Sequence, residues 1–224
     1  MPKREPWYVF AEWTLRPPLA LWFNWHFEGM ENIPPEGPAI AACNHISYFD
    51  PLAHAYMLVR ARRRPRFMAK RELYGNWLLR HVLEGAHQIP VDRGSGSSAP
   101  IDAAKQALSE GEIVMIYPEG TITKNPDYSP MQAKTGAARL TLSTSVPVLP
   151  LAVWGSQYVW QRDGARSLRL GRPIWVKAGP PLDFSEHEET KDDPGTLRTV
   201  TDAIMDELTR LVNDLRSRYP KSWQ

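Results

Sequence analysis

"GPAIAACNHISYFDPLAHAYMLV", residues 37–59, contains the transition that decides the fold. The run "PAIAAC" is typical of a buried strand and "PLAHAYMLV" of a helix, so the polar stretch "NHISYFDP" (44–51) is predicted to be a tight strand-to-helix turn. Such turns are where α/β proteins expose chemically active side chains. The turn contains His45 and Asp50. Asp50, which precedes Pro51, is either a helix cap or the partner of the imidazole.

The His45–Asp50 spacing permits a catalytic pair. A histidine with a near-neutral pKa can remove a proton from a hydroxyl group. A carboxylate bonded to the other ring nitrogen fixes the tautomer and stabilises the imidazolium that forms. One turn of chain can bring Asp50 back to His45, so the spacing alone leaves both interpretations open.

Six apolar, β-rich runs indicate the rest of the sheet. They are "PAIAAC" (38–43), "PRFMA" (65–69), "HQIPV" (87–91), "EIVMIY" (112–117), "VPVLPLAVW" (146–154) and "PIWVKAG" (173–179). Helix-like segments separate most of these runs, which predicts an α/β fold with a mostly parallel central sheet of about six or seven strands flanked by helices. The run at 146–154 holds two prolines, which favour an edge or bulged strand.

Three further helices are predicted. One follows Ser97 or Ser98 as its cap and stops at Gly111, and a second covers 132–143. A third, near the C-terminus, is amphipathic because its apolar residues recur at spacings of three and four. Those apolar residues are Leu197, Val200, Ile204, Leu208, Leu211 and Leu215.

The N-terminal segment is rich in aromatic residues, with Trp7, Trp13, Trp22 and Trp25 in the first 25 positions. An N-terminal helix is expected, either packed on the domain or lying in a membrane interface, where tryptophan rings favour the headgroup level. The expected organisation is an aromatic membrane-interface segment (1–27), the main domain (28–190), and a C-terminal helix packed on the domain (191–224).

The amino-acid composition excludes several classes of protein. The 224 residues are 42% hydrophobic and 23% charged, with a net charge of +2, which is too small to indicate a nucleic-acid partner. A single cysteine, Cys43, excludes an intrachain disulfide and fits a reducing compartment. No apolar run reaches about 18 residues, so no transmembrane span is expected. The histidines and the cysteine show no zinc spacing, so no metal site is expected.

Two further stretches carry polar side chains directly after predicted strands. "YPEGTIT" (117–123) places Glu119 on the rim that also holds His45 if the strands are parallel. "GAHQIPVDRG" (85–94) places Arg93 after another strand, and a guanidinium suits phosphate. Taken alone, the first stretch is also typical of a turn and the second of a surface salt bridge.

In order and kind these stretches resemble the glycerolipid acyltransferase family, whose best-known members are 1-acyl-sn-glycerol-3-phosphate acyltransferases. The resemblance covers roughly residues 28–180. The family's N-H-x-x-x-x-D block is matched by Asn44, His45 and Asp50. The other three blocks are matched by Gly85, Ile89, Asp92 and Arg93; by Tyr117, Pro118, Glu119, Gly120 and Thr121; and by Val146, Pro147, Leu149 and Pro150.

This resemblance implies transfer of a fatty acyl group from a thioester to a lysophospholipid hydroxyl, most naturally that of lysophosphatidic acid. The thioester would be acyl-coenzyme A or acyl-acyl carrier protein, with no cofactor and no metal. The implied working place is the cytoplasmic face of the membrane, as a peripheral or monotopic protein.

The resemblance also assigns roles to residues. His45 would be the general base and Asp50 its orienting partner. Substrate binding would involve a larger set, namely Asn44, Arg93, Glu119, Gly120, Thr121, Lys124 and Lys134. Lys124 and Lys134 enter because the arginine that the family carries after E-G-T is Ile122 here, so another cation must meet the acceptor phosphate.

Two rival functions follow from other features. Cys43 and His45 would face the same side of a strand, so a Cys–His thioesterase is an alternative. A non-catalytic lipid-surface protein would use the aromatic N-terminus and the arginine run "RARRRPR" (60–66). That run is either a solvated loop or a site for anionic headgroups or coenzyme A phosphates.

Overall fold

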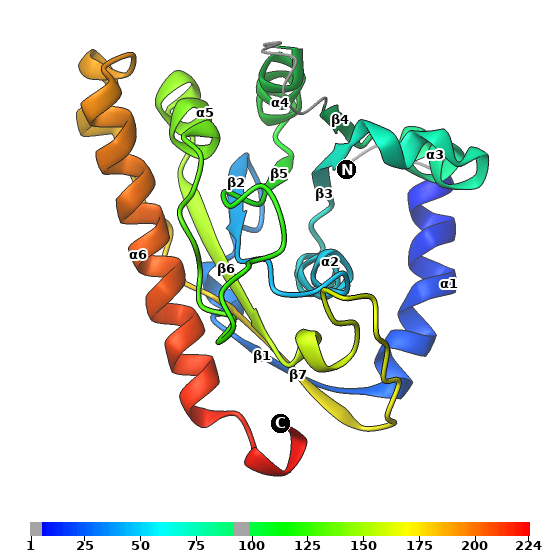
Figure 1. Ribbon diagram of the computed structural model, residues 1–224. Coiled ribbons are helices and arrows are strands. Elements are labelled where there is room, and N and C mark those ends of the chain that lie inside the picture. Colours follow the sequence, from blue (N-terminus) through cyan, green and yellow to red (C-terminus); the bar gives the residue numbers. More distant parts are fainter. Residues whose placement is uncertain (1–5, 92–98) are drawn as a thin grey trace.

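The computed structural model describes residues 6–91 and 99–224, and within them a single seven-stranded sheet lies between two layers of helices (Figure 1). The strands are β1 (Phe23–Glu28), β2 (Ala39–Cys43), β3 (Pro65–Lys70), β4 (Ile89–Val91), β5 (Ile113–Ile116), β6 (Val148–Trp154) and β7 (Arg172–Ala178). Their order across the sheet is β1-β7-β6-β2-β5-β3-β4. Only the β6–β7 pair is antiparallel among these strands, so the expected mostly parallel sheet is confirmed.

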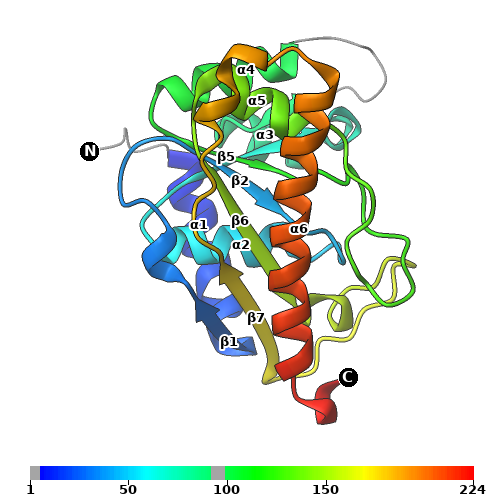
Figure 2. The ribbon, with the colours of Figure 1, turned by 90° about the vertical axis from the view of Figure 1, so that its left-hand side faces the viewer.

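The helices cover both faces of the sheet. They are α1 (Pro6–Trp22), α2 (Asp50–Arg60), α3 (Trp77–Gly85), α4 (Ala99–Ser109), α5 (Gly136–Thr144) and α6 (Pro194–Arg218). Figures 1 and 2 show α4, α5 and α6 on one face, with α2 on the other and α1 beyond it beside α3. Alternate residues of β2 serve the two faces: Ile40 and Ala42 pack under α4–α6, and Ala41 and Cys43 pack toward α2.

The predicted C-terminal amphipathic helix is confirmed as α6. Pro194 is its first residue, and the carboxylate of Asp193 caps it by accepting a hydrogen bond from the backbone N–H of Thr196 at 2.7 Å. All six residues of the predicted apolar stripe are buried. This stripe fastens α6 along β6 and so closes one face of the sheet.

β1 has no counterpart among the six predicted strands. Residues Phe23–Glu28 pair in parallel with Arg172–Lys177 of β7 and form the sheet edge. The expected boundary between residues 27 and 28 therefore falls inside a strand, and the segment outside the sheet is α1 alone. Alternating aromatic residues in "FNWHFE" have the period of a strand, but they were assigned to the aromatic segment as a whole.

Of the two alternatives for the run at 146–154, the edge strand is wrong, because β6 lies inside the sheet between β7 and β2. The proline ring is tolerated because Pro150 lies where the antiparallel partner stops. β7 ends at Ala178, and the next residue, Gly179, donates its N–H to the carbonyl of Pro150 at 2.9 Å. The missing N–H of Pro150 therefore faces the end of a strand, where the ladder needs no donor.

Helix boundaries agree with the predictions less closely than strands do. The helix expected over 132–143 begins four residues later, at Gly136. The caps expected at Ser97 and Ser98 lie outside the described residues, and α4 is described from Ala99. Among the helices in the described part of the chain, none has both the length and the apolar character that crossing a bilayer requires.

Candidate active site

The turn between β2 and α2 brings His45 and Asp50 together. Nδ1 of His45 lies 2.9 Å from Oδ2 of Asp50. The same oxygen accepts hydrogen bonds from the backbone N–H groups of Ile46 at 2.6 Å and Ser47 at 2.7 Å, and Oδ1 accepts one from the hydroxyl of Ser156 at 2.5 Å. Asp50 thus closes the turn and holds the imidazole. A carboxylate on Nδ1 favours the tautomer that leaves Nε2 free to accept a proton.

Both the backbone and the ring of His45 are held in place. Its N–H donates to Oε1 of Glu119 at 3.2 Å, and its carbonyl accepts from the N–H of Thr123 at 2.7 Å. The ring lies against Tyr117, with 4.4 Å between the ring centroids. Only 16% of the His45 side chain is exposed, whereas Asp50 is fully buried. The imidazole is therefore presented in one orientation.

Glu119 supports this turn and lies outside the cavity wall. Its second oxygen, Oε2, accepts from the backbone N–H of Met131 at 3.0 Å. Burial raises the pKa of Glu119 to about 7, partly offset by the backbone donors of Met131 and His45. In this structure Glu119 ties the loop after β5 to the His45 turn, and its contact with substrate stays a prediction.

Of the predicted substrate residues, some line the cavity and others lie outside its wall. Thr121 and Lys124 line the cavity beside His45. Gly120 has a φ of +71°, which only glycine adopts readily, and the side chain of Lys134 passes within 3.5 Å of where a Cβ would lie. Lys134 is exposed and sits outside the cavity wall. Arg93 lies outside the described residues.

Asn44 faces the sheet. Its amide accepts a hydrogen bond from the backbone N–H of Val153 at 2.8 Å and donates one to the carbonyl of the same residue at 3.1 Å. The side chain is fully buried. This geometry corrects the expected substrate contact, because Asn44 extends the β2–β6 pairing by one residue and thereby aims the turn that follows.

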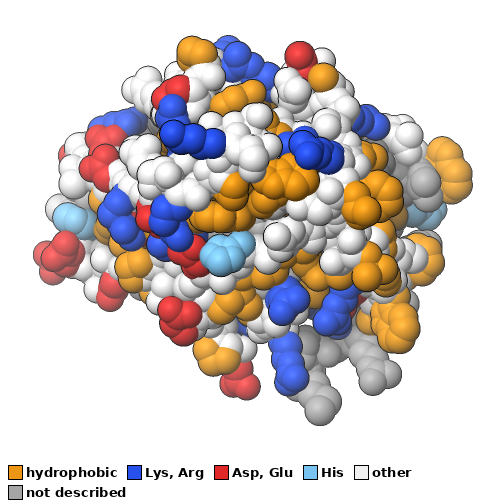
Figure 3. All heavy atoms as spheres, turned by 90° about the horizontal axis from the view of Figure 1, so that it is seen from below, with side chains coloured by type: hydrophobic (Ala, Val, Ile, Leu, Met, Phe, Trp, Pro, Cys, Tyr) orange, Lys and Arg blue, Asp and Glu red, His pale blue; other side chains and the backbone are white. Residues whose placement is uncertain are grey.

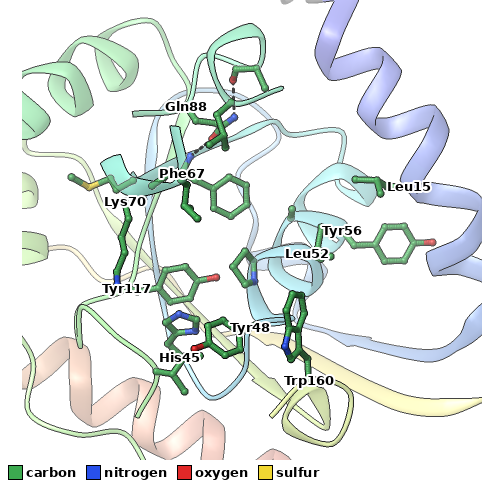
Figure 4. Close-up of a pocket in the computed structure, with 18 of the residues that line it drawn as sticks. Leu15, His45, Tyr48, Leu52, Tyr56, Phe67, Lys70, Gln88, Tyr117 and Trp160 are labelled. Atoms are coloured by element: carbon green, nitrogen blue, oxygen red, sulfur yellow. Dashed lines mark hydrogen bonds between the residues drawn. The ribbon is translucent and has the colours of Figure 1, made fainter. Parts of the chain in front are cut away.

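A cavity of about 980 Å³ opens beside His45. Figure 4 shows His45, Tyr48 and Trp160 at one end of it and Phe67 and Gln88 at the other. Its walls are mainly apolar side chains of α1, α2, β3 and α3. The charged lining residues are Arg16, Lys70, Lys124 and Arg162, with Glu12 as the one acid among the described residues that line it. A mainly apolar wall that also carries cationic side chains suits an amphipathic anion.

Two residues of the site had no signal in the sequence. His54 is buried, and its Nδ1 lies 3.2 Å from the hydroxyl of Tyr117. Burial lowers the pKa of His54 to about 4, so this histidine stays neutral near pH 7. Arg162 lines the cavity and donates to the carbonyl of Thr123 at 3.3 Å. It comes from a loop between two strands, outside every motif.

The arginine run at 60–66 lies at the far end of α2 from Asp50, about 15 Å along the helix. Arg63 donates to the backbone carbonyls of Pro34, Gly37 and Gly111. Arg66 pairs with Glu112. Two of the five arginines therefore hold the fold together, and the run does not contribute to the cavity at His45.

Cys43 does not have the surroundings of a nucleophile. It is fully buried, lies outside the cavity wall, and its thiol donates to the carbonyl of Ala41 at 3.6 Å. Burial raises the pKa of the Cys43 thiol well above its usual range, so the thiolate is not accessible.

We therefore expect Cys43→Ala to keep acyl-transfer activity within about twofold and to cost only about 1 kcal/mol of stability, as a small buried side chain is lost. The measurement is a steady-state rate beside a thermal melt. Loss of thioester cleavage in a folded Cys43→Ala protein would support a thioesterase with a Cys–His pair.

The sheet, the His–Asp pair at its rim and the apolar cavity define the class of this protein: an α/β protein with a histidine–aspartate pair beside a ligand-sized cavity. The family model described as Acyltransferase matches residues 24–154, more than half of the chain. The chain belongs to this acyltransferase family and is an acyltransferase. Membership contradicts the non-catalytic interpretation.

Relatives with assigned names agree. A 1-acyl-sn-glycerol-3-phosphate acyltransferase of Bacillus subtilis is 27% identical over 210 residues, covering 93% of this chain and 98% of its own length. One of the same name from Pseudomonas aeruginosa is 29% identical over 172 residues, covering 71% and 60%. The crystal structure of the 1-acyl-sn-glycerophosphate (LPA) acyltransferase PlsC from Thermotoga maritima superposes with a TM-score of 0.71 at 22% identity, covering 99% of this chain and 86% of that one. The last match supports the fold.

Proposed function

We propose that this enzyme transfers a fatty acyl group from a thioester to the free hydroxyl of lysophosphatidic acid, giving phosphatidic acid. The observation that carries the proposal is the 2.9 Å His45–Asp50 pair at the end of a cavity whose wall is mainly apolar and carries several cationic side chains. The names of the relatives from Bacillus subtilis and Pseudomonas aeruginosa support the acceptor.

The chemistry follows from the free Nε2 of His45. This nitrogen removes the proton of the acceptor hydroxyl while the oxygen attacks the thioester carbonyl carbon. The C–S bond then breaks, and the thiolate leaves with the proton that the imidazolium returns. Asp50 stabilises the imidazolium between the two proton transfers. The thioester supplies the activated acyl group, so the balance of this reaction needs neither a cofactor nor a metal.

The apolar cavity is the natural place for the acyl chain. Each methylene group removed from water there contributes about 0.8 kcal/mol. Leu52 and Tyr56 of α2, with Leu15 of α1, line the cavity between its two ends (Figure 4). A chain in this cavity would place its thioester near His45. The donor proposed is acyl-coenzyme A or acyl-acyl carrier protein.

The exposed hydrophobic side chains favour work at a membrane surface. Within the described part of the chain, the large exposed hydrophobic residues all belong to α1, the His45 turn, the segment from Leu73 to Trp77 and the loop before β7. They are Phe10, Trp13, Leu15, Leu21, Trp22, Tyr48, Leu73, Trp77, Leu168 and Leu170. Figure 3 shows hydrophobic side chains interspersed with Lys and Arg on the side where α1 lies. This pattern suits an anionic bilayer interface, and we place the enzyme on its cytoplasmic face.

The α1 end and the loop before β7 form one surface, because the indole N–H of Trp22 donates to the carbonyl of Leu168 at 2.7 Å. Leu21 is 82% exposed and Leu168 is 60% exposed. We expect Leu21→Ser combined with Leu168→Ser to weaken binding to vesicles of phosphatidylglycerol and phosphatidylcholine by roughly tenfold or more, since two apolar side chains lose their burial in the bilayer.

The measurement is vesicle co-sedimentation. Activity on substrates dispersed in detergent should stay near wild type, because both leucines lie outside the cavity wall. Unchanged vesicle binding by the double variant would contradict membrane contact through this surface.

The direct test of the proposed reaction is identification of the product. Purified protein is incubated with palmitoyl-coenzyme A, or with palmitoyl-acyl carrier protein, and lysophosphatidic acid, and the lipids are analysed by mass spectrometry. The proposal predicts phosphatidic acid carrying the donor chain with at least one donor. Acylation of lysophosphatidylcholine in preference to lysophosphatidic acid would overturn the acceptor assignment.

A further inference from the structure

Arg162 is held beside the His45 turn by a short chain of hydrogen bonds. One guanidinium nitrogen, Nη1, donates to the carbonyl of Thr123 at 3.3 Å. The N–H of Thr123 in turn donates to the carbonyl of His45 at 2.7 Å. Arg162 also lines the cavity. Arg162 is thus a cavity-lining cation whose loop is tied through Thr123 to the backbone of the proposed general base.

The other donors of this guanidinium are available for a ligand. In the described residues, Arg162 makes no second hydrogen bond and no ion pair. Its loop neighbours differ: the guanidinium of Arg166 lies 4.0 Å from the centroid of the Trp160 ring, and that of Arg169 lies 4.1 Å from the centroid of the Trp223 ring. Arg162 is therefore the arginine of this loop that faces the cavity with unused N–H groups.

The surroundings favour a phosphate. A guanidinium offers a planar fork that matches the oxygens of a phosphate monoester, and its charge is constant at any working pH. Lys124 and Lys70 line the same cavity and add positive charge. The loop beside them carries the uncharged Ile122, which also lines the cavity, so no guanidinium comes from that position.

We infer that Arg162 binds the phosphate monoester of the acceptor and supplies the guanidinium that Ile122 cannot. This inference rests on the proposed function, which provides an acceptor with a phosphate. The 3′-phosphate of coenzyme A offers the same chemistry, so the experiment must separate the acceptor from the donor.

The test is a set of steady-state measurements on Arg162→Gln. We expect the KM for lysophosphatidic acid to rise about tenfold, the size of effect that loss of one charge-assisted hydrogen-bond partner gives at an exposed site. The KM for palmitoyl-coenzyme A should stay within about twofold of wild type. With monoacylglycerol, an acceptor without phosphate, wild type and variant should have the same kcat/KM.

Two further variants sharpen the result. Arg169→Gln removes a charge from the same loop but away from the cavity, and it should leave the KM for lysophosphatidic acid unchanged. Ile122→Arg combined with Arg162→Gln should restore most of the lost affinity, because it returns a guanidinium to the same cavity.

Each outcome of these measurements either supports or overturns the assignment of Arg162 to the acceptor phosphate. An unchanged KM for lysophosphatidic acid in Arg162→Gln, an equal loss with monoacylglycerol, or a rise confined to palmitoyl-coenzyme A would overturn the inference while the proposed reaction stands. No transfer to lysophosphatidic acid by the wild type would overturn both. A selective rise that Ile122→Arg reverses supports the assignment.

Discussion

His45→Ala should lower the rate of acyl transfer by about 10²- to 10⁴-fold, the contribution that a positioned general base makes. Nε2 of His45 is the proposed proton acceptor, and His45 is the only histidine among the described residues that line the cavity. The nearest other histidine, His54, is buried and bonded to Tyr117, and burial keeps its pKa at about 4. The loss should appear in kcat, with the KM for the donor little changed.

The protein should remain folded without the imidazole. Asp50 keeps the N–H groups of Ile46 and Ser47 and the hydroxyl of Ser156 as donors, so its buried charge is still compensated. A thermal melt and circular dichroism check this. His187→Ala, at a surface histidine outside the cavity wall, is the matched control and should have wild-type activity. A folded His45→Ala protein with most of its activity would refute the base assignment.

Asp50→Asn should lower the rate by a similar factor, about 10²- to 10⁴-fold, because the imidazolium formed in the reaction loses the adjacent negative charge. The amide is close to the carboxylate in shape, and its oxygen can still accept from Ile46 and Ser47. The result therefore isolates the charge. The measurement is kcat across pH together with the free energy of unfolding.

Ser156→Ala provides the comparison for Asp50→Asn. It removes one hydrogen bond to Oδ1 of Asp50 and leaves the charge and the His45 contact in place. We expect only a several-fold loss of rate and a cost of about 1 kcal/mol in stability. If Asp50→Asn were no worse than Ser156→Ala, the carboxylate would serve to cap the turn, and its charge would not contribute to catalysis.

Most strands of the sheet and the His45–Asp50 centre of the site could be predicted from the sequence. Strand runs and the 44–51 turn are local features, because side-chain periodicity and turn residues act over a few positions. The proximity of His45 and Asp50 follows from one short turn and is observed at 2.9 Å. What each residue contacts is a separate matter. The predicted contact of Asn44 with substrate is wrong, because Asn44 bonds to the backbone of Val153, while Glu119 bonds to the backbone of Met131 and His45.

Other features depend on contacts between distant parts of the chain. β1 joins the sheet only through β7, about 150 residues later, so its partner is invisible in local pattern. Arg162 reaches the cavity because its loop packs against Thr123, 39 positions away in sequence. The cavity is formed by helices and strands that come together only in the folded chain. Hydrophobic periodicity is a local pattern and does not predict contacts between residues that are far apart in the sequence.

Acyl transfer with His45 as the base is tested most directly by measuring release of free thiol from palmitoyl-coenzyme A. The release is measured with and without lysophosphatidic acid, for the wild type and for His45→Ala. We expect rapid release that needs both the acceptor and His45, with one thiol freed for each phosphatidic acid formed. Release that is just as fast without acceptor, or that persists in folded His45→Ala protein, would contradict a transferase that uses His45 as its base.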